Sequence, residues 1–261
     1  MNRIYFSDSQ LLFVIGFNVR CILKRKILRA RLHQQKMIVI HENQEVRYAP
    51  TPSRAALYKQ GIQARGDHLG EVYYLKQIQF NSGDIIVDCG ANMGDLALYF
   101  KNRNLQIVYI GIEPNPTDFQ CLQLNQISGE IHNVGLWATS TTLPFYISTA
   151  AASSSFIEPP VFSKVIDIRA VPLSEIVGAR EIKLLKLEAE GAEPEVLIGC
   201  ESVLAQIEYI SADVGPERGL AEESTRNEVV SYLTTRKFVI IEEQLKHRKT
   251  VLFRNQSRIA N

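Results

Sequence analysis

The sequence lacks the patterns that mark metal-binding, secreted and nucleic-acid-binding proteins. Its 261 residues include four cysteines and five histidines, and neither C-x-x-C nor H-E-x-x-H spacing occurs, so no metal site is predicted. The cysteines lie far apart in the chain, which is typical of free thiols in a reducing, cytoplasmic compartment. The formal net charge is only +1, and no basic face with interleaved aromatic residues is present, so no nucleic-acid partner is expected.

Long hydrophobic runs are also missing. The N-terminal apolar run LLFVIGFNV, residues 11–19, is too short to cross a bilayer. Seven Lys and Arg residues follow it from Arg20 to Lys36, and no acid lies between Asp8 and Glu42. These charges come after the apolar run, whereas a signal peptide carries them before it. Two interpretations stay open: an amphipathic helix packed on the domain or a partner subunit, and a basic helix on a membrane surface.

The most informative segment that is present reads IIVDCGANMGD, residues 85–95. Three apolar residues form a strand end, Asp88 follows, and Gly90 and Gly94 flank Asn92 before the helical sequence LALYF. A strand, a glycine turn and a helix form a nucleotide-type site at the carboxyl end of a strand. Gly90 lets a ligand lie against the backbone and permits a positive φ. The helix start offers free N–H groups to an anionic ligand group.

The spacing of this motif distinguishes between two kinds of cofactor, a dinucleotide and S-adenosylmethionine. The dinucleotide fingerprint is G-x-G-x-x-G, whereas D-x-G-x-N-x-G has an acid before the first glycine and no third glycine. An acid there repels pyrophosphate and suits a cationic group, so S-adenosylmethionine, with its ammonium, carboxylate and sulfonium, is the expected cofactor. Asp88 would bind the ammonium directly or through water. A tight turn with a capping acid is the alternative without a ligand.

A second acid ends the next apolar segment, IVYIGIEPNP, residues 107–116. Glu113 belongs to the following βα unit, where a carboxylate can accept hydrogen bonds from both ribose hydroxyls. Pro114 then stops the strand, and Asn115 lies in the turn after it. We therefore predict Glu113, Pro114 and Asn115 as cofactor-binding residues. An acid that merely favours the start of a helix is the alternative.

From residue 84 onward the pattern alternates between strands and helices. We predict strands at 84–88, 107–112, 131–135, 182–188, 206–213, 237–242 and 249–254. We predict helices near 94–103, 116–126, 173–177, 193–204 and 223–236. This alternation indicates an α/β fold with a mostly parallel sheet, helices on both faces and a C-terminal hairpin. Residues 81–261 are the predicted cofactor domain, and residues 1–80 a basic helical extension and cap, with a strand pair near 37–48 and helices near 53–60 and 69–79.

Three segments resemble the FkbM family of methyltransferases, over about residues 50–254. LLKLEAEGAEPEVLIGC, residues 184–200, is similar to the family signature K-I-D-x-E-G-A-E followed by V-L-x-G. DCGANMGDLALYF resembles the cofactor loop, and IEPNPTDFQCLQLN resembles the E-P-x-P segment. The family usually has Asp where this chain has Glu188. The resemblance implies a Rossmann-like, seven-stranded methyltransferase sheet that binds S-adenosylmethionine.

The same signature supplies the candidate catalytic residues. Methylation of an oxygen releases a proton, so a general base within hydrogen-bond reach helps. Glu190 is the first candidate and Glu188 the second, because crowded carboxylates raise one another's pKa. Lys186 is predicted to pair with one of them. Asp213 ends the next strand at the same sheet edge and is a candidate for substrate contact.

Two further segments are assigned from the resemblance. It places HNVGLW, residues 132–137, at the border of the adenine ring, so Val134, Gly135 and Leu136 are predicted to pack near the base. It places a substrate loop in the interval of the polar run STAAASSSF, residues 148–156. That run is either a mobile flap over the substrate or a surface loop.

The predicted function is an S-adenosylmethionine-dependent O-methyltransferase. The resemblance suggests a hydroxyl of a sugar, polysaccharide, glycolipid or secondary metabolite as the acceptor, so the expected partner is a small molecule or glycan. An NAD-dependent oxidoreductase and a non-catalytic, cofactor-binding partner protein are the alternatives. The missing third glycine counts against the oxidoreductase. Glu188, where the family usually has Asp, leaves the non-catalytic alternative open. The segment with Arg54 and Arg65 either covers the pocket mouth or forms a solvated helix.

Overall fold

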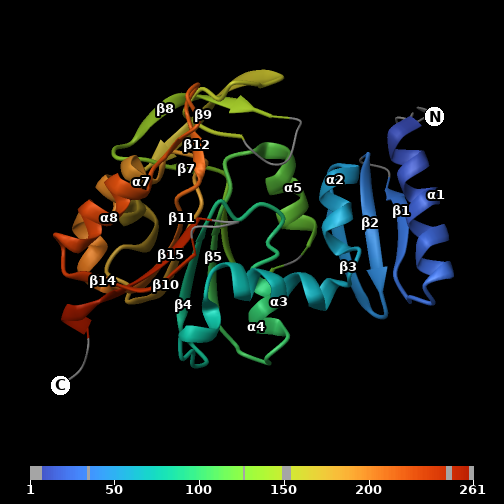
Figure 1. Cartoon of the computed structure of the whole chain (residues 1–261), viewed down its shortest axis with the longest axis horizontal. Helices are drawn as coiled ribbons and strands as arrows, with labels where there is room; N and C mark the ends of the chain where they lie inside the picture. Colours follow the sequence, from blue (N-terminus) through green and yellow to red (C-terminus); the bar gives the residue numbers. More distant parts are fainter. Residues whose placement is uncertain (1–7, 34–35, 126, 149–153, 245–248, 259–261) are drawn as a thin grey trace.

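The fold is built on a seven-stranded sheet with the strand order β14-β15-β11-β10-β4-β5-β6 (Figure 1). The computed structural model describes residues 8–33, 36–125, 127–148, 154–244 and 249–258. Strands β4, β5, β6, β10 and β11 run parallel, and β15 is antiparallel to β11 and β14. The predicted parallel sheet with a C-terminal hairpin is confirmed. The strands are β4 (Ile85–Cys89), β5 (Val108–Ile112), β6 (Gly129–His132), β10 (Ile182–Leu187), β11 (Ile207–Asp213), β14 (Phe238–Gln244) and β15 (Thr250–Asn255).

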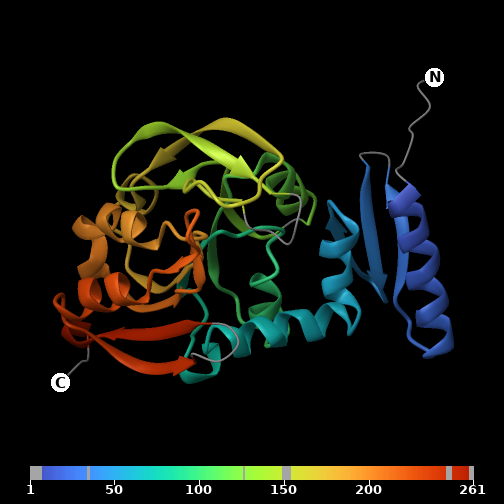
Figure 2. The same cartoon turned by 45° about the horizontal axis from the view of Figure 1, so that its top comes forward.

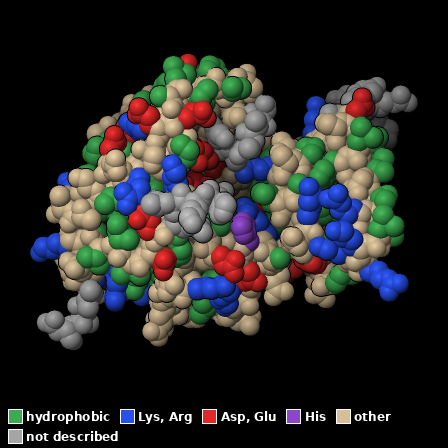
Figure 3. Space-filling model, in the orientation of Figure 1, with side chains coloured by type: hydrophobic (Ala, Val, Ile, Leu, Met, Phe, Trp, Pro, Cys, Tyr) green, Lys and Arg blue, Asp and Glu red, His purple; other side chains and the backbone are tan. Residues whose placement is uncertain are grey.

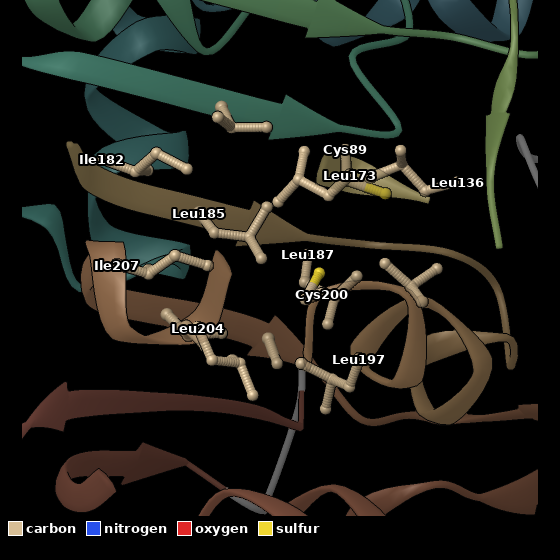
Figure 4. Close-up of a cluster of buried hydrophobic side chains, with 14 of the residues drawn as sticks. Cys89, Leu136, Leu173, Ile182, Leu185, Leu187, Leu197, Cys200, Leu204 and Ile207 are labelled. Atoms are coloured by element: carbon tan, nitrogen blue, oxygen red, sulfur yellow. The ribbon is translucent and has the colours of Figure 1, made fainter. Parts of the chain in front are cut away.

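Helices cover both faces of this sheet because successive strand residues point to opposite sides. Val87 and Leu185 pack with helices α6, α7, η3 and α8 in one apolar cluster, part of which is drawn in Figure 4. Their neighbours Ile86 and Leu184 pack with α3, η2 and α4 on the other face. These helices are α3 (Ile62–Val72), η2 (Leu75–Gln77), α4 (Ala97–Lys101), α6 (Leu173–Val177), α7 (Glu193–Gly199), η3 (Glu201–Gln206) and α8 (Arg226–Thr234), with α5 (Pro116–Leu124) after β5 and η4 (Gln256–Arg258) at the end.

A second sheet, which the sequence did not predict, lies above the central one (Figure 2). It has the order β7-β9-β8 and is formed by β7 (Gly135–Leu136), β8 (Thr141–Ile147) and β9 (Lys164–Val171). The predicted strand 131–135 is therefore wrong at its end, because β6 stops at His132 and Gly135 already belongs to β7. Asn133 makes the turn between them, donating from Nδ2 to the carbonyl oxygens of Glu113 and Pro114. A short pair, β12 (Pro216–Arg218) and β13 (Glu223–Ser224), follows β11.

The N-terminal cap lies at the end of the molecule opposite β14 (Figure 1). Its sheet has three antiparallel strands instead of the predicted two, and the predicted helix at 69–79 is wrong in position, because α3 covers residues 62–72. The cap is not separate in its packing: Phe17 and Met37 share an apolar cluster with Met93 and Cys121. The boundary at residue 80 stays a prediction. The cap elements are α1 (Asp8–Leu23), β1 (Arg29–His33), β2 (Met37–Glu42), β3 (Glu45–Ala49), α2 (Pro52–Ala55) and η1 (Ala56–Tyr58).

Candidate active site

A cavity of about 290 Å³ opens where β4, β5 and β10 end. It lies at the carboxyl ends of parallel strands, where open α/β sheets bind ligands. Ten of the predicted site residues line it: Asp88, Gly90, Asn92, Glu113, Pro114, Gly135, Leu136, Lys186, Glu188 and Glu190. Four others, Gly94, Asn115, Val134 and Asp213, are not among the lining residues.

The glycine loop after β4 follows the backbone course that its sequence predicts. Gly90 has φ +73°, and a Cβ there would lie 2.2 Å from the carbonyl oxygen of Glu188. The amides of Gly90 and Ala91 both donate to the carbonyl oxygen of Ile112, at 3.0 Å each, which ties the loop to the end of β5. Only glycine tolerates both the positive φ and this close approach. Gly94 serves packing instead, since a Cβ there would meet side chains behind the loop.

Lys186 is a buried cation that joins the ends of β10 and β4. Its side chain is 4% exposed, and Nζ lies 3.1 Å from Asp88 Oδ1 and 2.8 Å from Glu188 Oε2. Nζ also donates to the carbonyl oxygens of Cys89 and Gly90, at 3.0 and 2.8 Å. Burial alone would lower the pKa of Lys186, but the two carboxylates raise it well above its ordinary value. The ammonium therefore stays charged and holds the glycine loop in place.

Asp88 is held from both sides. The hydroxyl of Tyr109 donates to its Oδ2 at 2.6 Å, opposite the Lys186 ammonium at Oδ1. Burial raises the pKa of Asp88, while Lys186 and Tyr109 act against that rise. Oδ2 is thus hydrogen-bonded within the chain, whereas Oδ1 is buried and faces the Lys186 ammonium without a hydrogen bond among the described residues. Tyr109 was not identified from the sequence, because a tyrosine inside an apolar strand carries no local signal of its partner.

Glu113 is a buried residue that directly follows β5. Its Oε2 accepts from the amide of Asn92 at 2.7 Å, and its Oε1 accepts from the amide of Asn115 at 2.8 Å. Burial raises the pKa of Glu113, and the nearby Asp118 carboxylate raises it further. Glu113 also lines the cavity. Asn115 has a different task from the predicted one: its side chain caps α5 by accepting from the amide of Thr117 at 3.0 Å.

Glu190 occupies the loop between β10 and α7 in a strained conformation. Its φ is +50°, in the left-handed region that non-glycine residues rarely adopt. The buried Glu193 shapes this loop by accepting from the amides of Ala189 and Gly191, at 2.8 and 3.3 Å. Burial raises the pKa of Glu190 well above its ordinary value, and neighbouring carboxylates raise it further: Glu217 first, then Glu188, Glu193 and Asp213.

Asp213 therefore acts at a distance from the cavity. It is buried at the end of β11, and its Oδ1 accepts from the amide of Gly215 at 3.1 Å. Its charge raises the pKa of Glu190. The sequence placed Asp213 at the correct sheet edge, but the structure does not bring it to the cavity wall. Direct substrate contact by Asp213 stays a prediction.

The second sheet closes the cavity with aromatic side chains. Phe156 lies against Gly135, where a Cβ would come within 2.1 Å of its ring, and it packs edge-on against Phe145 at a centroid distance of 4.9 Å. Ser155 Oγ donates to the carbonyl oxygen of Glu190 at 2.7 Å. The end of the polar run 148–156 thus contacts the site, as the flap hypothesis requires, although its residues 149–153 lie outside the described part of the chain.

The cap supplies the opposite wall through Arg54 and Arg65, so covering the cavity is the correct choice of the two interpretations for this segment. Arg65 pairs with Asp95 at 3.0 Å. Asp95 also binds Arg47 at 2.8 Å and the hydroxyl of Tyr58 at 2.5 Å, and both of these side chains are buried. The sequence analysis missed this network. The acid in GANMGD was its only local signal, and the partners come from 30 to 48 residues earlier in the chain.

The cavity has the groups that S-adenosylmethionine requires. Two buried carboxylates, Asp88 and Glu113, suit an ammonium and a pair of hydroxyls, and the glycine loop brings bare backbone to the wall. The side-chain oxygen of Asn92 is buried and has no hydrogen-bond partner among the described residues, so it is ready to accept from a ligand. No cluster of His, Cys, Asp and Glu in the described part of the chain has the arrangement of a metal site.

Comparisons with known proteins identify the family of the chain. The family model described as the methyltransferase FkbM domain matches residues 88–242, more than half of the chain. Methyltransferase 1 of Beauveria bassiana is 28% identical over 150 residues, which cover 47% of this chain and 60% of that protein. The 31-O-demethyl-FK506 methyltransferase FkbM of Streptomyces tacrolimicus is 23% identical over 210 residues, covering 66% of this chain and 79% of that protein.

A second fungal protein and a solved structure are also similar to parts of the chain. Methyltransferase sdnD of Sordaria araneosa is 27% identical over 159 residues, covering 46% of this chain and 61% of that protein, so the chain matches about three fifths of each fungal relative. The solved structure of M. capricolum TrmK with S-adenosyl-homocysteine has a TM-score of 0.44 and 11% identity, covering 72% of this chain and 68% of that one. The family model covers more than half of the chain and shows that the chain belongs to the FkbM methyltransferase family.

Proposed function

We propose that this methyltransferase acts on oxygen, and that its acceptor is a hydroxyl of a sugar, polysaccharide, glycolipid or secondary metabolite. The observation that carries the proposal is the Glu190 carboxyl with its raised pKa, in the same cavity as the Asp88 and Glu113 carboxylates. A hydroxyl must lose a proton when it is methylated, and a carboxylate with a raised pKa is a stronger base than an ordinary one. The name of the Streptomyces tacrolimicus relative describes O-methylation by that protein.

The cavity residues divide into two roles under this proposal. Asp88, Glu113 and the glycine loop hold S-adenosylmethionine, which supplies an activated methyl group when it is bound. Glu190 accepts the proton of the acceptor hydroxyl. Glu188 is the weaker candidate for the base, because its Oε2 is bound to the Lys186 ammonium at 2.8 Å. Lys186 is a positioning residue, since its Nζ contacts the carboxylates and the loop carbonyls.

The wall opposite the cofactor loop supports the acceptor class. Phe145 and Phe156 present aromatic surface to the cavity, beside the carboxyls of Glu188 and Glu190. Aromatic faces pack on the C–H surfaces of rings, and carboxyl groups bind hydroxyls. A polyhydroxylated ring compound satisfies both kinds of surface.

The test is release of S-adenosylhomocysteine from S-adenosylmethionine with a panel of glycans, glycolipids and hydroxylated metabolites. Glu190→Gln should lower kcat by about 10² to 10⁴-fold and leave the affinity for S-adenosylmethionine unchanged. In the wild type, kcat should rise with pH through the neutral range, because the raised pKa leaves Glu190 protonated at low pH. Glu158→Gln, at an exposed glutamate, is the matched control and should leave both quantities unchanged.

Two outcomes would count against this proposal in different ways. Full turnover by Glu190→Gln would move the base to another residue, with Glu188→Gln as the next variant. Tight binding of S-adenosylmethionine without turnover on any hydroxylated acceptor would favour the non-catalytic, cofactor-binding alternative. The oxidoreductase alternative no longer stands, since the chain belongs to a methyltransferase family.

A further inference from the structure

Helix α1 (Asp8–Leu23) is attached to the cap by its polar residues. Asn18 Nδ2 donates to the carbonyl oxygen of Ala30 at 2.9 Å, and the amide of Ala30 donates back to Asn18 Oδ1 at 2.7 Å. Gln10 Nε2 donates to the carbonyl oxygen of Lys36 at 2.7 Å. Phe17 and Cys21 are buried on the same side of the helix. These contacts set the rotation of α1 about its axis.

The opposite side of α1 is apolar and exposed. At 3.6 residues per turn, its large aliphatic residues fall within an arc of about 120°. Their exposed fractions range from 49% to 78%. A helix that only packs on its own domain points its polar side outward, whereas α1 does the reverse. The exposed residues are Leu11, Leu12, Ile15, Val19, Ile22 and Leu23, followed by Ile27 after the helix.

A cluster of cations lies beside this apolar side (Figure 3). Arg20 is in the last turn of α1, Lys24 and Arg25 follow it, and Arg29 and Arg31 extend from β1. Arg29 Nη1 donates to neutral carbonyl oxygens of the chain, which leaves its charge uncompensated. No acid lies between Asp8 and Glu42 to balance the cluster.

We infer that α1 docks on the surface of an anionic membrane, with its aliphatic residues among the acyl chains and the cations on the lipid headgroups. A helix with one apolar side and flanking Lys and Arg lies in the plane of the membrane interface. Each such cation near an anionic leaflet contributes to binding. A second copy of the chain fits this surface poorly, because a two-fold contact through α1 would bring two cation clusters together.

The docking mode is peripheral. At 16 residues, α1 is about 24 Å long at 1.5 Å per residue, shorter than the roughly 30 Å hydrocarbon core of a bilayer. Among the described residues, no helix is long and apolar enough to span a membrane. The inference concerns the cap surface and does not depend on the acceptor that the cavity binds.

The test is flotation of the full chain with phosphatidylcholine vesicles and with vesicles that also contain phosphatidylserine. The chain should float with the anionic vesicles, and high salt should weaken the binding. The variant Leu12→Ser/Ile15→Ser/Ile22→Ser should lower the partition coefficient at least about tenfold. The variant Arg20→Gln/Lys24→Gln/Arg25→Gln should lower binding to anionic vesicles by about the same factor, with no change for neutral ones.

A matched control separates this surface from general hydrophobicity. Val161→Ser/Leu220→Ser removes aliphatic residues that are 74% and 68% exposed but lie outside the cap, and it should float like the wild type. Calorimetry with S-adenosylmethionine should give the same affinity for every variant, which shows that each one is folded.

Three results would overturn the inference. The first is absence of flotation with anionic vesicles by a chain that binds S-adenosylmethionine. The second is vesicle binding that survives the triple aliphatic substitution. The third is a dimer in sedimentation analysis that the same substitution dissociates, which would assign the surface to a second copy of the chain.

Discussion

Asp88 and Glu190 both line the cavity, but their carboxyl groups lie in opposite electrostatic surroundings. Asp88 has the Lys186 ammonium at 3.1 Å and the Tyr109 hydroxyl at 2.6 Å. Glu190 is surrounded by further carboxylates, and its pKa rises by burial and by their charge. The Lys186 ammonium and the Tyr109 hydroxyl oppose the rise that burial causes in the pKa of Asp88, which suits a binding group. An uncompensated carboxylate changes its protonation easily and serves as a proton acceptor.

The backbone shows the same difference between these two regions. The loop at Asp88 has glycines at two of its positive φ angles, Gly90 and Gly94, and Asn92 at φ +56° is of a residue type that tolerates the left-handed region. The loop at Glu190 places a charged residue at φ +50°, which costs on the order of 1 kcal/mol or more. Hydrogen bonds to Glu193 hold that loop in position. A charged residue in the left-handed region thus lies on the side of the cavity that we assign to the chemistry.

The largest expected effect comes from removing the shared cation. Lys186→Met leaves two carboxylates, Asp88 and Glu188, without their partner, and Asp88 is fully buried. Breaking a buried pair from one side should lower the free energy of unfolding by about 3 to 5 kcal/mol, as measured by urea denaturation. The control Lys76→Met breaks an exposed pair with Glu71 and should change the free energy of unfolding far less, because solvent screens that pair. Equal losses for the two variants would contradict the assigned role of Lys186.

The next effect tests which carboxylates bind the cofactor. Asp88→Ala and Glu113→Ala should each weaken S-adenosylmethionine binding more than tenfold, or by about 1.4 kcal/mol or more, in calorimetry. Asp167→Ala, at an exposed carboxylate on β9, should leave the affinity unchanged. An unchanged affinity of Asp88→Ala for S-adenosylmethionine would show that Asp88 does not bind the cofactor.

A smaller effect is expected for the hydroxyl that supports Asp88. Tyr109→Phe removes the 2.6 Å hydrogen bond and leaves a buried carboxylate oxygen without its donor. The expected loss in unfolding free energy is about 1 to 3 kcal/mol, with weaker cofactor binding. Tyr146→Phe on β8, outside the cavity lining, should change neither quantity. A loss of stability without any loss of cofactor affinity would limit Tyr109 to a structural role.

The last prediction concerns a slope instead of a single loss: the dependence of stability on pH. The pKa of Glu190 rises from 4.5 to about 10 in the folded chain, and burial raises the pKa of Glu193 to about 7. Because the folded state then binds more protons than the unfolded state, unfolding free energy should fall as pH rises from about 5 to 9. Glu190→Gln should flatten this slope, most clearly above pH 7. Identical slopes for variant and wild type, by thermal unfolding without ligand, would contradict the raised pKa.

Sequence reasoning located the parts of the site that depend on neighbours along the chain. The predicted residues that line the cavity at these strand ends are Asp88, Gly90, Asn92, Glu113, Lys186, Glu188 and Glu190. Each of these lies at a strand end, and strand ends are recognisable because an apolar run stops at a polar or glycine residue. Parallel pairing then brings the ends to one edge of the sheet.

The parts that were missed depend on residues far apart in the chain. Lys186 contacts the carbonyl oxygen of Cys89 across 97 positions, and Arg47 reaches Asp95 across 48. The second sheet was missed because β8 and β9 are separated by a polar run that resembles a surface loop. No short window of sequence contains both members of any of these contacts.

The order of residues along the chain was therefore enough to predict the class of fold and the methyl donor. It also predicted where the carboxylates Asp88, Glu113, Glu188 and Glu190 lie. Each of these predictions follows from a pattern within a single βα unit. Packing in three dimensions set the opposite electrostatic surroundings of Asp88 and Glu190 and the outward orientation of the apolar side of α1. Both follow from which distant groups lie within a few ångströms, because burial and nearby charge set a pKa and neighbouring elements set the rotation of a helix.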